Sequence, residues 1–596
     1  MVIRTKGFAA LLDQGPRRRE VDRRVETAHW AGSIPQEMAR VPALRFGKRW
    51  VSSLWLLPLG AAALVVGIAL AQQLRQYGWM QDFIAAYPGT SGQVTPVITT
   101  GFPAWLRWQH LFNIVFMMFL IRAGLQILAD HPRLYLRQGC RPGTAWLRMR
   151  GPVPAERLNS AERVDGTKVW TAKDDSVALP KWLGIPGVRH TIGLARWWHF
   201  TFDLLWLLNG AVFYVLLFTS GEWRRIVPQS WDVLPNAAST MIQYASLNFP
   251  VNDGFTDYNA LQVIAYFTTV FVAAPLAFVT GMLQSPAVAA RFGLDRGPLN
   301  HQVARTAHFA VLLWMVFFIA VHSLMVFTTG LVGNLNHIVL GTDTESYWPL
   351  VIYLIAMSVI AALWLAASPL TLRYPGVVRR VGTVLLGRIT ELLDRPHPVA
   401  TYTEKDISPY FWANGTPPAS EHYRALQKGD WADYALRVEG LVENPVTLTY
   451  AQLLAMPRHE QVTGHHCIQG WTGVAQWAGV RMADIVELVR PLPSARWVVF
   501  YSFADGSGPP NEGRYYDCHR IAHMSEPTTL LAYEMNGAPL TEDHGAPLRL
   551  RNEHELGFKM VKWIEAIEFI DDFRYRGLGM GGYNEDHEYF GHQVPF

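Results

Sequence analysis

The sequence has 596 residues, of which half are apolar and 17% are charged, and this length predicts two or more domains. Its net charge of +4 is too small to indicate binding to nucleic acid. The three cysteines, Cys140, Cys467 and Cys518, are far apart, which excludes a disulfide framework and an iron–sulfur cluster and gives no sign of an oxidising compartment.

Arginine is frequent in the first 50 residues, for example at 17–19 and 23–24. No early apolar stretch followed by a cleavage site occurs there, so we expect no signal peptide and a retained membrane anchor farther on. We predict a cytoplasmic N-terminal segment over residues 1–50 and a membrane domain over residues 51–370.

Six apolar segments are long enough to cross a bilayer, for which a helix needs about 20 residues. They cover residues 54–71, 111–128, 200–219, 261–283, 309–329 and 350–367. For this half we predict an all-α bundle of about six transmembrane helices, within which four helices form a haem-binding core.

Lysine and arginine are unevenly divided among the loops. The N-terminal tail and the loops after the second, fourth and sixth segments are basic, whereas the loops after the first, third and fifth hold few such residues or none. Because basic loops stay on the cytoplasmic side, this alternation predicts a multi-pass protein of the cell inner membrane. Both termini and the whole C-terminal part are then expected in the cytoplasm.

Four histidines lie within or at the ends of these segments: His110, His199, His308 and His322. His308 and His322 are 14 residues apart, which on an α-helix is about 21 Å of rise along nearly one face. The orientation above pairs His199 with His308 near the inner surface, and His110 with His322 near the outer surface. Two stacked bis-histidine sites predict two b-type haems. His301 lies on nearly the same face and is interpreted as a loop residue.

Three sequence motifs around these histidines resemble prokaryotic di-haem cytochrome b subunits of the formate dehydrogenase, thiosulfate reductase and hydrogenase type. They are RWQHLFN at 107–113, RWWHF at 196–200 and ARTAHF at 304–309. The resemblance covers residues 104–331 and implies that the first and sixth segments lie outside the four-helix core.

The composition changes after the sixth apolar segment. Residues 371–405 are basic and partly amphipathic, which predicts a linker along the inner membrane surface. Residues 406–596 contain short segments of β character between turn residues, which predicts an α+β domain. Its expected strands cover residues 434–442, 446–450, 497–503, 530–535 and 564–570, with short helices after Ala451 and Met482.

Cys467 lies in the sequence GHHCIQGW at 464–471. A lone thiolate beside histidines and a Gly-Trp turn suits a single soft bond to a metal. Taken alone, this spacing also fits a partly buried free cysteine. Cys518 is the rival candidate for a metal thiolate, but it lacks the Gly-Trp context.

Several motifs of this domain resemble the sulfite oxidase family of molybdopterin enzymes, most closely its bacterial methionine-sulfoxide-reducing branch. They are HCIQGW at 466–471, WAGV at 477–480, LAYEMNG at 531–537, HGAPLRL at 544–550 and GFKMVKW at 557–563. The resemblance implies that Cys467 is the catalytic thiolate on molybdenum. It also implies that the cofactor is bound by Asn414, His544, Arg549, Met560, Val561 and Lys562, with Arg549 and Lys562 near its phosphate.

The sequence departs from that family in three ways. Residues 551–555 (RNEHE) replace a more apolar strand. His544 stands where relatives of the sulfoxide-reducing branch often have asparagine. No arginine adjoins Cys467, so an anion pocket of the sulfite-oxidising type is not evident.

We therefore predict a molybdenum-dependent oxidoreductase with Mo-molybdopterin and two haem b groups, which couples quinol or quinone to oxygen-atom transfer on a small substrate. Reduction of an S- or N-oxide is favoured. Expected partners are membrane lipid, quinone and the small-molecule substrate. The alternatives are a sulfite-type dehydrogenase that reduces quinone, a haem protein whose soluble domain only docks a partner, and a histidine-lined metal transporter.

Overall fold

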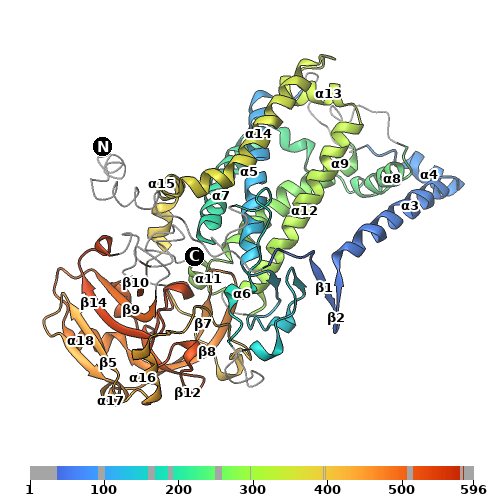
Figure 1. Cartoon of the computed structure of the whole chain (residues 1–596). Helices are drawn as coiled ribbons and strands as arrows, with labels where there is room; N and C mark the ends of the chain where they lie inside the picture. Colours follow the sequence, from blue (N-terminus) through green and yellow to red (C-terminus); the bar gives the residue numbers. More distant parts are fainter. Residues whose placement is uncertain are drawn as a thin grey trace, which may run out of the picture.

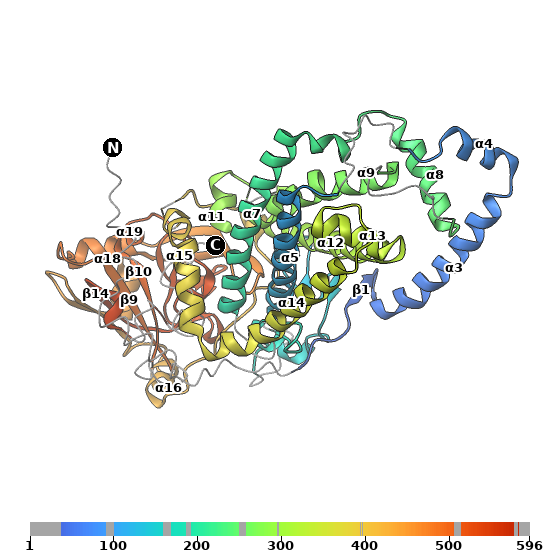
Figure 2. The ribbon, with the colours of Figure 1, turned by 90° about the horizontal axis from the view of Figure 1, so that it is seen from above.

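The computed structural model describes residues 37–90, 101–158, 168–185, 192–248, 258–294, 297–393, 395, 397–505, 514–576 and 582. Within them a helical half and a β-rich half lie side by side, with α15 (Pro375–Leu393) at their junction (Figure 1). The view from above shows the same division (Figure 2). Residues 1–36 of the predicted N-terminal segment lie outside the described residues.

Six helices among the described residues are long and apolar enough to cross a membrane, which confirms the six predicted segments. They are Ser53–Leu74 (with α3, Leu56–Leu74), α5 (Ala104–Asp130), α7 (Ile192–Ser220), Ala260–Met282 (α9, Ala260–Phe267; η5, Thr268–Ala273; α10, Ala274–Met282), α12 (His301–Thr328) and α14 (Trp348–Arg373). Large apolar side chains such as Leu57, Leu64 and Leu365 are exposed on them. Apolar helix surfaces that no protein covers are suited to lipid.

The long helices do not contribute equally to the bundle. α3 stands apart, beside α8 (Val233–Ala245), where Arg75 Nη1 donates to Ser246 Oγ at 3.2 Å (Figures 1 and 2). α14 is joined to α5 by the fully buried Arg122, which donates to Ser368 Oγ at 2.6 Å and to the Gly184 carbonyl at 3.0 Å. The remaining short helices of this half are α4 (Gly78–Ala86), α6 (Ala172–Asp175), α11 (Pro286–Arg291) and α13 (Leu331–Leu335).

The start of α12 corrects the interpretation of His301 as a loop residue, because His301 is the first residue of this helix. Asn300 caps the helix: its side chain accepts from the backbone N–H of Gln302 at 3.0 Å and of Val303 at 3.3 Å. Such a cap satisfies amide groups that the first turn leaves without a partner. The helix therefore extends well before His308.

Residues 371–405, predicted as a linker, contain the helix α15. Leu386 on this helix packs against Leu194 and Trp197 of α7. Gly382 marks the closest approach, because a Cβ atom at this position would clash with the Trp197 ring. The connection between the two halves is thus a helix docked on the bundle.

The β-rich half contains two sheets of five strands each among the described residues. The first has the order β10-β9-β14-β5-β6; the second has β12-β11-β8-β7, with β13 paired to β11. The strands are β5 (Ala435–Gly440), β6 (Val446–Thr449), β7 (His459–His466), β8 (Thr472–Arg481), β9 (Trp497–Asp505), β10 (Arg514–Arg520), β11 (Leu530–Met535), β12 (Ala538–Pro539), β13 (Arg549–Arg551) and β14 (Ile564–Ile570). The helices are α16 (Glu421–Lys428), α17 (Tyr450–Ala455), α18 (Met482–Val489) and α19 (Ile521–Met524).

All five predicted strands are confirmed, and α17 and α18 occupy the two places predicted for helices. The strands β7, β8, β10, β12 and β13 were not predicted. β7 has the sequence HEQVTGHH, which lacks an apolar alternation, and it is a strand because it pairs with β8 along its whole length. Pairing of this kind overrides weak local propensity.

The loop between α5 and α7 joins the two halves. Its strands β3 (Arg133–Leu134) and β4 (Leu147–Arg148) form a small sheet with β1 (Ala43–Phe46) and β2 (Arg49–Ser52). Beyond it, Cys140 and Trp170 share one hydrophobic core with Trp412 and Trp471 of the β-rich half. Trp412 Nε1 donates to the Cys140 carbonyl at 2.7 Å. This shared core fixes the orientation of the two halves.

Candidate metal and cofactor sites

Cys467 opens the tight turn between β7 and β8. Its backbone N–H donates to the Trp471 carbonyl at 3.0 Å, and the Gly470 N–H donates back to the Cys467 carbonyl at 2.9 Å. Gly470 has φ 98°, which favours glycine, and a Cβ atom there would lie 3.1 Å from Arg305 Nε. The turn therefore depends on glycine both for its conformation and for its approach to α12.

The Cys467 thiol is buried beside a side-chain amide. Its Sγ lies 3.8 Å from Gln469 Oε1, and the same oxygen accepts from Asn414 Nδ2 at 2.9 Å. Gln469 Nε2 donates to the Asp130 carbonyl at 3.2 Å and, at 3.4 Å, to the Ala172 carbonyl. Gln469 thus joins the thiol to the predicted pterin-binding loop and to the helical half. The sequence analysis missed this role, although Gln469 stands inside the HCIQGW motif.

Two enclosed cations lie beyond Asn414. Lys562 Nζ donates to the Asn414 carbonyl at 2.5 Å and to the Asp543 carbonyl at 2.7 Å, while Arg549 Nη1 donates to the His544 carbonyl at 2.9 Å. Burial and the neighbouring Arg549 hold the pKa of Lys562 well below its usual value, and Arg549 Nε is buried without a hydrogen bond. A bound anion would favour the charged forms of both side chains, which burial disfavours despite the Asp543 and Glu553 carboxylates.

The other predicted cofactor residues are placed differently. The His544 ring packs against Phe411, with ring centres 5.8 Å apart, at the edge of the Cys467 site. Val561 packs in the hydrophobic core between the sheets. Met560 lines a separate small cavity. The structure therefore brings Cys467, Asn414, His544, Arg549 and Lys562 together, while the Met560 and Val561 side chains point elsewhere.

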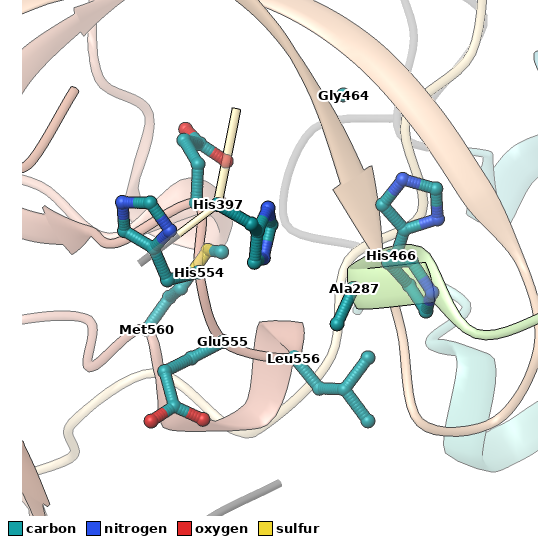
Figure 3. A pocket seen from close by; sticks show the side chains of 10 residues that line it. Ala287, His397, Gly464, His466, His554, Glu555, Leu556 and Met560 are labelled. Atoms are coloured by element: carbon teal, nitrogen blue, oxygen red, sulfur yellow. The ribbon is translucent and has the colours of Figure 1, made fainter. Parts of the chain in front are cut away.

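Figure 3 shows that small cavity, of about 10 Å³, which is lined by His397, His466, His554, Glu555 and Met560 among others. The volume suits about one water molecule. The ring centres of His397 and His554 are 4.9 Å apart, and burial together with His397 lowers the pKa of His554 to about 3. Among the described residues, no three histidine, cysteine or acidic side chains are arranged to hold a metal ion. The sequence analysis missed this cluster.

The four histidines of the long apolar helices face one another in the predicted pairs. The ring centres of His110 and His322 are 6.3 Å apart, and those of His199 and His308 are also 6.3 Å apart. Two imidazoles whose nitrogens each lie about 2 Å from a shared metal have ring centres roughly 6 Å apart. The spacing of both pairs therefore fits one metal ion between the rings.

Polar side chains lie close to both imidazoles of the inner pair, and one of them is at hydrogen-bond distance. Thr280 Oγ1 lies 3.0 Å from His308 Nδ1, and a hydrogen bond there leaves Nε2 free to bind a metal. Asp203 Oδ2 lies 3.6 Å from His199 Nε2. A Cβ atom on Gly124 would lie 3.3 Å from His199 Cε1, so the backbone of α5 passes close to this ring.

The outer pair borders a cavity of about 300 Å³. The size suits a small organic ligand or part of a larger one. Tyr266 Oη lies 3.5 Å from His322 Nδ1, and a hydrogen bond there would again leave Nε2 free. Besides the two histidines, the cavity lining includes Arg107, Leu111, Phe327, Val339, Tyr353 and Met357.

Comparison with known families identifies the β-rich half. The profile of the family described as oxidoreductase molybdopterin binding domain matches residues 423–575. This segment includes Cys467, His544, Arg549 and Lys562, whereas Asn414 precedes it. The match assigns a molybdopterin-binding fold to the part of the chain that holds the candidate thiolate.

The curated proteins that are similar to the chain include the following three. The oxidoreductase YuiH of Bacillus subtilis (strain 168) is 35% identical over 144 residues, which is 24% of this chain and 68% of YuiH. The putative protein-methionine-sulfoxide reductase subunit YedZ1 of Azospira oryzae is 32% identical over 164 residues, covering 28% and 57% of the two chains. The protein-methionine-sulfoxide reductase catalytic subunit MsrP of Ralstonia nicotianae is 30% identical over 196 residues, covering 30% and 58%. The chain thus spans little more than half the length of the latter two.

Proposed function

Because the chain belongs to the family of oxidoreductases that carry a molybdopterin-binding domain, we propose that this molybdenum-dependent oxidoreductase reduces a small S- or N-oxide with electrons that quinol supplies through two b-type haems. One observation carries the proposal. Gln469 joins the Cys467 thiol to Asn414, and the Asn414 carbonyl accepts from Lys562, so a soft metal ligand and an anion site meet in one place.

At the Cys467 site, a bound molybdenum–pterin group supplies two-electron oxygen-atom transfer. Cys467 would provide the protein thiolate, and the Gln469 amide would hold that sulfur in place. Arg549 and Lys562 would bind the phosphate of the pterin, since both are enclosed cations. Asn414 and His544, with the backbone at Met560 and Val561, would complete the contacts with the pterin.

In the membrane half, His199 and His308 would hold an inner haem b, and His110 and His322 an outer one. The equal ring separation of 6.3 Å in both pairs supports this assignment. Thr280 supports it further, because it can fix His308 in the tautomer that binds iron through Nε2.

The six apolar helices would cross the membrane in a defined orientation. The alternation of basic loops and the exposed apolar helices support a multi-pass protein of the inner membrane, surrounded by lipid, with the molybdopterin domain in the cytoplasm. The outer histidine pair would then exchange electrons with quinone, and the inner pair with the molybdenum side.

Molybdenum content and a visible spectrum of the purified full chain test this function together. We expect molybdenum in the protein and a Soret band. In quinol-reduced protein, methionine sulfoxide, dimethyl sulfoxide or trimethylamine N-oxide should reoxidise the haem.

The alternative outcomes are distinct. Haem reduction on adding sulfite to the oxidised protein would support a quinone-reducing dehydrogenase. A haem protein without molybdenum would support a docking role for the soluble domain. A colourless protein would contradict the haem assignment altogether.

A further inference from the structure

Both helices that carry the inner histidine pair begin at the Cys467 turn. On α12, Gln302 precedes His308 by six residues, and on α7, Arg196 precedes His199 by three. At 1.5 Å of rise per residue, these separations are about 9 Å and about 4.5 Å along the helix axes. The contacts of Gln302 and Arg196 with the turn therefore lie within two helical turns of the inner pair.

Gln302 makes the most specific of these contacts. The residue is fully buried, and its Nε2 donates to the Gly470 carbonyl at 3.0 Å and to Thr472 Oγ1 at 3.1 Å. Thr472 Oγ1 in turn donates to the Gln138 carbonyl at 2.7 Å. The Gln302 amide therefore holds the closing end of the Cys467 turn on the first turn of α12.

Two arginines, Arg196 and Arg305, also contact the Cys467 turn. Arg196 Nη1 donates to the Ile468 carbonyl at 3.3 Å. Arg305, one turn after Gln302, packs against Gly470 and donates to the carbonyls of His131 and Arg133, each at 2.8 Å. The turn is thus held by α7 on one side and by α12 on the other.

We propose that Gln302 is a positioning residue that fixes the distance between the inner histidine pair and the metal site at Cys467, and so sets the rate of electron transfer between them. The inference rests on the proposed function. A buried amide that bonds two polar groups of one turn fixes the position of that turn on the helix. Apolar contacts alone would allow the turn to shift along the helix surface. Gln302 Oε1 is buried without a hydrogen bond, a cost that packing alone does not explain.

The electron balance of the step is simple. Reduction of one S-oxide to a sulfide and water consumes two electrons and two protons. Oxidation of one quinol to quinone releases the same number of each. Because a haem iron changes by one electron at a time, two separate one-electron transfers would cross the Gln302 interface in each turnover.

The test replaces Gln302 with methionine in the full chain, since methionine keeps the length of the side chain but loses the donor. In Gln302→Met we expect reoxidation of the quinol-reduced haem by methionine sulfoxide to slow by about tenfold or more, because small displacements have large kinetic effects. Turnover driven by a reduced viologen dye, which feeds the metal site directly, should stay within about twofold. Exchange of the 468–472 amide hydrogens should become faster, whether or not cofactors are bound.

Thr306→Val is the matched control. Thr306 Oγ1 donates to the Tyr135 carbonyl at 2.7 Å and accepts from Trp146 Nε1 at 3.1 Å, so valine removes buried hydrogen bonds of the same helix that do not involve the Cys467 turn. This variant should keep the wild-type ratio of the two rates. If Gln302→Met folds poorly, Gln302→Glu replaces it, because a carboxylate keeps the length and polarity but cannot donate.

Two results would overturn the inference: an equal fall of the haem-linked and dye-linked rates, or unchanged amide exchange in the turn. Failure of the proposed function is a different result, namely wild-type protein that lacks a Soret band or turns over no oxide. The amide exchange measurement still decides the role of Gln302 in that case.

Discussion

In the helical half the candidate ligands lie on regular helices, whereas in the β-rich half they lie in turns and loops. His308 and His322 share one face of α12, and their partners stand on α7 and α5. Cys467 and Lys562, by contrast, come from distant segments and are joined through Asn414 and Gln469. A site built on helices inherits its geometry from the backbone, but a site built from loops depends on each contact within it.

Replacement of the thiolate is expected to have the largest effect. Cys467→Ser should reduce oxide reduction by at least about a hundredfold with either quinol or dye as the donor, because the soft metal ligand is lost. The haem spectrum should stay as in wild type, since the histidine pairs lie on other elements. Activity assays measure the loss of oxide reduction, and the visible spectrum shows whether the haems are retained. Cys518→Ser serves as the control, and a comparable loss there would move the metal site to the rival cysteine.

Removal of one histidine from the helical half should affect the haem there and leave the Cys467 site unchanged. His308→Ala is expected to lose the inner haem, so that haem content falls by about half and quinol-linked turnover stops while dye-linked turnover persists. A pyridine haemochrome assay measures this directly. His301→Ala is the matched variant on the same helix, and it should retain both haems. Loss of haem in His301→Ala instead would show that the pairs are wrongly assigned.

Substitution of two glycines by alanine tests the same difference between a turn and a helix. Gly470→Ala should lower the free energy of unfolding by about 1–3 kcal/mol, because its φ of 98° strains an alanine and the added Cβ meets Arg305. Gly210 lies within α7, where a Cβ atom would meet nothing within 4 Å. Gly210→Ala should therefore be neutral or stabilising by up to about 1 kcal/mol. Thermal unfolding in detergent measures both, and equal costs would remove the distinction between turn and helix.

The smallest expected effect is on pH dependence. Burial and Arg549 lower the pKa of Lys562 in the folded chain, so between that pKa and about 10.4 the unfolded chain binds more protons than the folded one. Cofactor-free protein should therefore gain stability as pH rises through this window, by at most about 1.4 kcal/mol per pH unit. Lys562→Met should flatten the slope in unfolding titrations. A steeper slope in the variant would show that Lys562 is not the group responsible.

Much of the fold could be predicted because it depends on local sequence patterns. The six apolar segments, the five apolar strands and the facing of His308 toward His199 all follow from hydrophobic length, alternation or helical repeat. The strand β7 could not be predicted, because its polar sequence HEQVTGHH takes this form only when paired with β8. His301 was misplaced because the cap at Asn300 lies outside the apolar stretch that marked the helix.

Local sequence is enough to identify the apolar segments, to predict which histidines pair and to pick out the motif with the candidate thiolate, since each depends on neighbouring residues. Packing of distant elements is what lets Gln469 link the thiol to Asn414, brings Lys562 beside Arg549, and lets Gln302 bond the Cys467 turn. These contacts join residues separated by tens to hundreds of positions. Their geometry depends on how whole elements pack, and no local pattern encodes that packing.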